Sequence, residues 1–149
     1  MNTKPEETQS LSMEFDLPHG PAKVWRALTE PELLAKWLMA TDMQPVVGKA
    51  FTFKLQPPPP PGGWDGTVSC EMQEVEPPKR LRYSWGGGGL NTTMVTWTLT
   101  PTTTGGTLLR LEHTGFPTGK AQAQYFEGAK WGWQRMAGKR LGEVLAEVA

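Results

Sequence analysis

The feature that most constrains the fold of this chain is a run of five alternating segments followed by one long helical pattern. Between residues 51 and 116, apolar and polar side chains alternate in FTFKL, TVSCEMQEV, RLRYSW, TMVTWTLT and TLLRLEHTGF. A period of two is typical of strands with one buried face, and the short turns between most segments favour an antiparallel meander. The same period in LSMEFDL, at residues 11–17, predicts a further strand ahead of the five.

Helices are predicted before and after the meander in the sequence. PAKVWRALTEPELLAKWL has helical spacing with a break near Thr29–Pro31, which indicates two short helices. From about Gly119 to Val148 the apolar residues step by three, four and seven, which predicts one long amphipathic helix. A sheet with one apolar face needs a cover, and this helix can provide it. The expected fold class is α+β, in the order β-α-α-β-β-β-β-β-α, with a curved antiparallel six-stranded sheet around the C-terminal helix.

Length and charge limit the number of domains and the kinds of partner. A chain of 149 residues is a common size for one core, so we expect a disordered tail at 1–10 and a single domain at 11–149. Fifteen basic residues balance fifteen acidic ones, which argues against nucleic acid and membrane surfaces as partners. The N-terminus lacks the apolar core of a secretion signal, and no segment is long enough to span a bilayer. The expected location is therefore the cytoplasm.

Few side chains are suited to holding a metal or another cofactor. Cys70 is the single cysteine, and its place in the alternation is that of a small buried apolar side chain. His19 lies in a loop between prolines. Two histidines and one cysteine do not make up the ligand set of a zinc site. We therefore predict neither a metal nor any other cofactor.

Five consecutive prolines, Pro57–Pro61, have three candidate meanings: a docking site for a proline-reading partner, a linker between domains, or a stiff turn. The two flanking segments both alternate, and their apolar faces need the same helix, which excludes a domain linker. Five residues in the extended left-handed conformation of proline rise about 15 Å, and Gly62 and Gly63 supply the reversal that proline cannot. We interpret the run as a stiff connection that shapes one end of the space under the helix, with docking as the weaker alternative.

Large aromatic side chains dominate the predicted inward face. Such a face is common in small-molecule cavities, although a filled core would use the same residue types. Because large aromatics rarely fill a narrow gap between helix and sheet without leaving voids, we predict a ligand cavity there. Its predicted lining is Trp37, Phe51, Phe53, Tyr83, Trp85, Trp97, Leu111, His113, Phe126 and Trp133.

His113 is the most reactive side chain expected on this face. The period of two places it inward beside leucines, where it could orient a ligand or act as acid or base near neutral pH. The alternative is a structural histidine bonded to a backbone group at the end of its strand. Tyr83 is predicted as its polar companion, because a buried phenol needs a partner. If the protein is an enzyme, His113 and Tyr83 are the candidate catalytic residues.

Several of these strings resemble one known superfamily over almost the whole chain, from about Phe15 to Leu145. They are PAKVWRALTEPELLAKWL, WDGTVSCEMQEVEPPKRLRYSW, MVTWTLTPTTTGGTLLRLEHTGF and GWQRMAGKRLGEVL. They are similar to the helix-grip superfamily of START domains and the birch-pollen allergen. More narrowly, they resemble bacterial homologues of the C-terminal domain of the heat-shock-protein-90 ATPase activator. The resemblance implies a curved sheet gripping the last helix, around a cavity that in relatives takes lipids, sterols, polyketides or aromatic metabolites.

Three functions follow from the residues and the resemblance. The first is binding of a hydrophobic or aromatic small molecule, without catalysis. The second is an enzyme of the polyketide cyclase or aromatase kind, which would use His113 and Tyr83. The third is a stress-related role with a chaperone partner, which the family name implies although no docking surface can be read from the sequence. Formation of a homodimer stays open.

Overall fold

A computed structural model of the chain describes residues 8–55, 59, 65–87, 90–118 and 123–148. Residues 8–76 contain strand β1 (Thr8–Leu17), helices α1 (Pro21–Thr29) and α2 (Pro31–Trp37), and strands β2 (Ala40–Thr41), β3 (Ala50–Lys54) and β4 (Thr67–Glu76). Strands β5 (Arg80–Gly87), β6 (Leu90–Pro101) and β7 (Thr107–Pro117) follow. The last helix consists of α3 (Ala123–Arg135), a π-helical turn η2 (Met136–Arg140) and α4 (Leu141–Glu147).

The strands form one antiparallel sheet in the order β1-β7-β6-β5-β4-β3-β2. The predicted α+β helix-grip class is confirmed, but the sheet has seven strands where we expected six. The additional strand, β2, contains only Ala40 and Thr41, which pair with Lys54 and Phe53 of β3. A strand of two residues is too short to show an alternation, so no sequence pattern predicts it.

The first strand also begins earlier than expected, at Thr8 instead of residue 11. Thr8 and Gln9 pair with Pro117 and Phe116 at the end of β7. This pairing uses backbone groups, so it requires no apolar side chain and leaves no period in the sequence. Residues 1–7 of the predicted tail lie outside the described residues.

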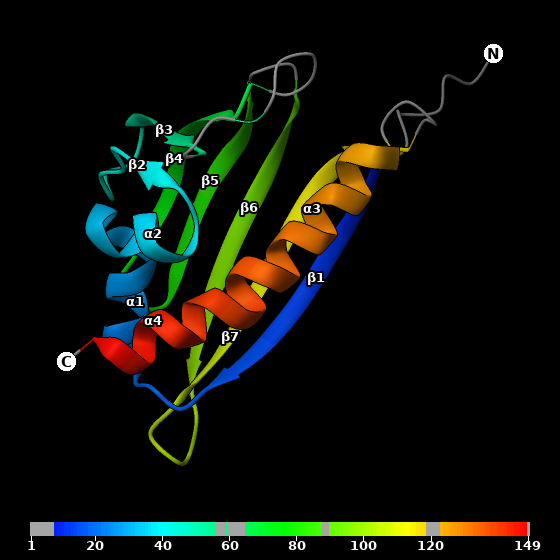
Figure 1. Cartoon of the computed structure of the whole chain (residues 1–149). Helices are drawn as coiled ribbons and strands as arrows, with labels where there is room; N and C mark the ends of the chain where they lie inside the picture. The colour runs from blue at the N-terminus through cyan, green and yellow to red at the C-terminus, as the bar shows by residue number, and fades with distance from the viewer. Residues whose placement is uncertain (1–7, 56–58, 60–64, 88–89, 119–122, 149) are drawn as a thin grey trace.

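The C-terminal helix covers one face of the sheet (Figure 1). It crosses the sheet from the end of β7 towards α1, and α4 contacts both α1 and α2. Its glycines differ in their surroundings. A Cβ built on Gly138 would lie 3.4 Å from Cε1 of Phe15 in β1, whereas Cβ atoms on Gly128 and Gly142 would meet nothing within 4 Å. Gly138 therefore marks a close approach of the helix to a strand, and the other two leave space beside the helix.

The connection between β3 and β4 contains the proline run. Because these two strands pair directly, the run joins neighbours of one sheet, as predicted. The connection closes where Leu55 N–H donates to the carbonyl of Gly66 at 2.8 Å. Gly66 has φ of 86°, and a Cβ there would lie 2.6 Å from Cδ of Pro59, so both conformation and space require glycine. Of residues 57–61 only Pro59 is described, so the shape of the run lies outside the described residues.

Candidate functional site

The aromatic side chains predicted to face inward form one connected cluster. The Trp97 ring lies 5.9 Å from that of Trp37 and 5.4 Å from that of Trp133, and Trp133 lies 5.1 Å from Trp85. Trp85 in turn lies 5.6 Å from Phe53. The two pairs of Trp97 are edge-to-face, an arrangement that aromatic rings prefer, and the two pairs of Trp85 are tilted. The sheet and the helix are thus held together by ring-to-ring contacts.

Much of this cluster is tightly packed. The fully buried members of the predicted lining are Trp37, Phe53, Tyr83, Trp97, Leu111, His113 and Trp133. Phe51 is also buried, 5.4 Å from the Tyr83 ring, and Phe126 is partly buried, 5.2 Å from Phe116. Their contact with a ligand stays a prediction.

An apolar pocket of about 560 Å³ opens beside this cluster, under α3 and η2. Trp85 and Trp133 belong to both the pocket and the predicted lining. The other residues around the pocket are Leu38, Met39, Leu55, Val68, Tyr125, Gly128, Ala129, Trp131, Gly132, Arg135, Met136 and Arg140. The volume falls within the roughly 300–1,000 Å³ usual for small-molecule sites.

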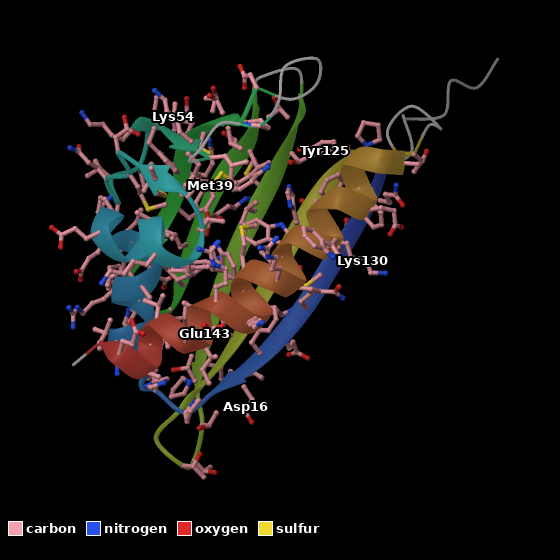
Figure 2. The ribbon with its side chains drawn as sticks, viewed as in Figure 1. Asp16, Met39, Lys54, Tyr125, Lys130 and Glu143 are labelled. Carbon is pink, nitrogen blue, oxygen red and sulfur yellow. The ribbon has the colours of Figure 1, made fainter. Side chains whose placement is uncertain are left out.

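Two segments that are far apart in the sequence bound this pocket. Met39 follows α2, and Tyr125 lies in the first turn of α3; Figure 2 shows them on facing sides of the space between these elements. Lys130, also on α3, points away from that space (Figure 2). Gly128 and Gly132 line the pocket and leave room for it, since a Cβ on Gly128 would meet nothing within 4 Å and one on Gly132 only Cε of Met136, at 3.4 Å.

His113 lies behind the pocket in a closed hydrogen-bond network. Trp133 Nε1–H donates to His113 Nδ1 at 2.9 Å, so Nδ1 carries no proton. The neutral ring is then protonated at Nε2, which lies 2.6 Å from Thr93 Oγ1 and donates to it. Thr93 Oγ1 donates its own proton to the carbonyl of Trp85 at 3.0 Å. Tyr125 OH, 3.3 Å from the same Oγ1, is left as a donor to it.

This network holds His113 as a neutral ring. Burial lowers the pKa of His113 to about 3, because the charged form would lose its hydration. Both ring nitrogens are engaged, and the ring does not line the pocket. The arrangement therefore lacks an open nitrogen with which His113 could exchange a proton with a bound ligand. Tyr125 connects the network to the pocket, since its side chain is part of the pocket wall.

Tyr83 has a different partner from the one predicted. Trp97 Nε1–H donates to the Tyr83 hydroxyl at 3.0 Å, so Tyr83 is paired with a tryptophan and His113 with Thr93 and Trp133. The alternation identified both residues as inward-facing, but it could not identify which inward residues of different strands meet. Burial raises the pKa of Tyr83, which therefore stays protonated.

Thr93 is a member of this network that no sequence prediction included. It shares the inward period with Val95, Trp97 and Leu99 of β6, so the signal was present. Val95 of β6 pairs with His113 of β7, and Thr93 lies two residues from Val95 on the same face, within reach of the histidine ring. Tyr125, Gly128, Gly132 and Met136 also repeat at three or four residues on one side of the last helix, which marks the pocket wall.

Replacing Thr93 with Val should lower the free energy of unfolding by about 2–3 kcal/mol, measured by urea denaturation. Valine has nearly the same shape, but it leaves His113 Nε2–H and the Trp85 carbonyl without their buried partner. Thr93→Ser keeps the hydroxyl and should cost about 1 kcal/mol or less, for the lost methyl group. Equal stability of the two variants would contradict the network.

The other candidate reactive groups are separated from the pocket. Cys70 is buried, and burial raises the pKa of its thiol, so it stays protonated as an apolar side chain. Within the described ranges, no three His, Cys, Asp or Glu side chains lie together as a metal site would require. The same ranges contain no helix with the length and apolar character of a membrane span.

Comparison with solved structures places this fold among bacterial proteins. The protein MLL2253 from Mesorhizobium loti is 35% identical, with a TM-score of 0.82, over 95% of this chain and 99% of that one. CalU16 from Micromonospora echinospora is 27% identical, with a TM-score of 0.69, over 91% of this chain and 65% of that one. DynU16, described as a putative protein of the dynemicin biosynthetic locus, shares the fold at 24% identity and a TM-score of 0.72. This match covers 92% of this chain and 47% of DynU16.

Family membership rests on a match over most of the chain. No curated protein matches this sequence. A family model does match, over residues 18–146, from just before α1 into the last turn of α4. The resemblance inferred from the sequence is thereby confirmed. The chain belongs to the family described as Activator of Hsp90 ATPase homolog 1-like protein.

Proposed function

We propose that this protein binds a hydrophobic or aromatic small molecule in the pocket under α3 and η2. The observation that carries the proposal is the pocket itself: about 560 Å³, walled mainly by aliphatic and aromatic side chains. Transfer of an apolar molecule from water to such a wall contributes roughly 25 cal/mol for each Å² buried. Trp85 and Trp133 join the pocket to the rigid aromatic cluster, so its inner wall is formed before a ligand arrives.

Binding without catalysis accounts for the polar groups better than an enzyme does. The enzyme hypothesis relied on His113 as acid or base and on Tyr83 as a hydrogen-bond donor. The engaged ring nitrogens of His113 and the bond from Trp97 to Tyr83 describe a structural network behind the wall. The occurrence of the fold in a biosynthetic locus, that of DynU16, supports a small-molecule ligand and identifies none. A chaperone partner has no specific observation in its favour.

The proposal is tested by narrowing the pocket. Gly132→Leu should weaken binding of a neutral hydrophobic probe, 1-dodecanol, at least about tenfold, since the leucine side chain takes up the volume needed for the probe. A Cβ at residue 132 would meet only the flexible Cε of Met136, at 3.4 Å, so the variant should fold. Binding is measured by isothermal titration calorimetry below the solubility limit of the probe.

Gly142→Leu is the matched control. It makes the same change in the same helix, with nothing within 4 Å of the new Cβ, at a residue outside the pocket wall. Both variants should gain helix propensity, by up to about 1 kcal/mol, while only Gly132→Leu should lose binding. If native mass spectrometry and calorimetry detect no hydrophobic ligand on the wild-type protein, or if both leucines act alike, the proposal is wrong.

A further inference from the structure

Two arginines stand at the rim of an otherwise apolar pocket. Arg135 and Arg140 both line it, and its wall within the described residues contains no aspartate or glutamate. Neither arginine takes part in the ion pairs that the described side chains form. Over the whole chain, fifteen basic and fifteen acidic residues cancel, so this excess of positive charge is local.

The π-helical turn places Arg140 on the pocket side of the helix. In a regular α-helix, successive residues turn by about 100°, so residue 140 would lie about a third of a turn away from Gly128. The turn η2 adds one residue, and Leu141 N–H bonds to the carbonyl of Met136, five residues back. This addition gives Arg140 the angular position that residue 139 would otherwise have, within about 20° of Gly128.

Both guanidinium groups are held near the pocket by contacts that leave donors unused. Arg140, which lines the pocket, donates from Nη2 to the carbonyl of Lys36 in α2 at 3.2 Å. The Arg135 guanidinium lies 5.3 Å from the centre of the Trp131 ring, and this tryptophan, 62% exposed, lines the pocket as well. A guanidinium has five N–H donors, so each keeps several for an acidic group.

We infer that the ligand is an amphiphile with an acidic head group, whose apolar body fills the pocket and whose head group pairs with Arg135 and Arg140. This inference rests on the proposed function and adds the chemical class of the ligand. An apolar wall selects the body, and two guanidinium groups with unused donors at the rim select negative charge, because a charge-assisted hydrogen bond is stronger than a neutral one. A hydrocarbon or an alcohol would offer neither cation a counterion.

The test compares two probes with the same chain, dodecanoate and 1-dodecanol, by isothermal titration calorimetry at pH 7.5 and constant salt. Dodecanoate should bind at least about tenfold more tightly than dodecanol, the equivalent of one charge-assisted contact. In the double variant Arg135→Gln/Arg140→Gln this ratio should fall below about threefold, because dodecanoate should lose more affinity than dodecanol. If the double variant does not fold, the two single variants replace it in the test, and each should reduce the ratio of dodecanoate affinity to dodecanol affinity.

Lys130→Gln is the control for general charge. It removes one positive charge from the same helix, at an exposed residue that points away from the pocket (Figure 2). It should keep the full preference for dodecanoate. Equal binding of both probes to the wild type, or an equal loss of preference in Lys130→Gln and in the arginine variants, would overturn the inference while leaving the pocket as a hydrophobic site. Failure of both probes would overturn the proposed function as well.

Discussion

Replacing Trp97 with Ala should lower the free energy of unfolding by about 3–5 kcal/mol, the range typical of large-to-small changes at buried aromatic positions. Trp97 is fully buried on β6, its ring contacts those of Trp37 and Trp133, and its indole N–H bonds to Tyr83. The change opens a cavity at the point where α2, the sheet and the last helix meet. The loss in the free energy of unfolding is measured by urea denaturation, followed by circular dichroism. Since whole domains have only about 5–15 kcal/mol of stability, the variant should be close to unfolding at 37 °C.

Trp131→Ala provides the matched control for this prediction. The same substitution then removes an indole that is 62% exposed and contacts the Arg135 guanidinium at 5.3 Å. An exposed cation–π contact contributes about 0.5–1 kcal/mol, so the loss should be no larger than this. If Trp97→Ala proves too unstable to purify, Trp97→Phe should cost less but still exceed the control. A cost of Trp97→Ala below that of Trp131→Ala would show that the cluster does not hold the layers together.

Lowering the pH from 7 to 5 should reduce the free energy of unfolding by about 2 kcal/mol through His113 alone. Burial lowers the pKa of this ring to about 3 in the folded chain, whereas an unfolded histidine titrates near 6.5. Between these values the unfolded state binds the proton and the folded state does not. The contribution of neutral His113 to the free energy of unfolding is therefore fully present above about pH 6.5 and is lost as the pH falls towards 3. The slope is at most about 1.4 kcal/mol per pH unit.

The second histidine allows this contribution to be isolated. The pKa of His19 is also lowered, by partial burial and by the neighbouring Lys23, so His19→Gln corrects for its contribution. The steep pH dependence of the free energy of unfolding should persist in His19→Gln. In His113→Gln it should flatten between pH 7 and 5. If His113→Gln does not fold, nitrogen chemical shifts of the wild type should show His113 neutral and protonated at Nε2 at pH 5. A charged His113 at pH 5 would contradict the network.

The long strands and the helices could be predicted from the sequence because apolar side chains recur along each of them at a regular spacing, every second residue in a strand and every three or four in a helix. In β5, for example, Leu81, Tyr83 and Trp85 alternate with Arg82 and Ser84, and the structure buries the first three. The β2 strand could not be predicted, because its two residues have no period. The pairing of Thr8 and Gln9 with β7 could not be predicted either, since backbone hydrogen bonds leave no pattern in polar side chains.

The candidate site was predictable in part. Strand alternation identified Trp85 as inward-facing and helical spacing identified Trp133, and both line the pocket. These patterns could not distinguish them from Trp37 and Trp97, which are buried in the same interior but do not line the pocket. The difference depends on how closely the helix approaches each part of the sheet, and that distance is a property of the assembled layers.

The sequence by itself determined the fold class, the inward face of every long strand and the family, because these depend on hydrophobic period and turn residues along the chain. The tertiary structure decided the rest. It placed Thr93 between His113 and Trp85, paired Tyr83 with Trp97, and opened the pocket between the segment after α2 and the α3 wall. One extra residue in η2 turns Arg140 towards that pocket, and an added residue of this kind appears in the backbone hydrogen bonds and not in the pattern of side chains.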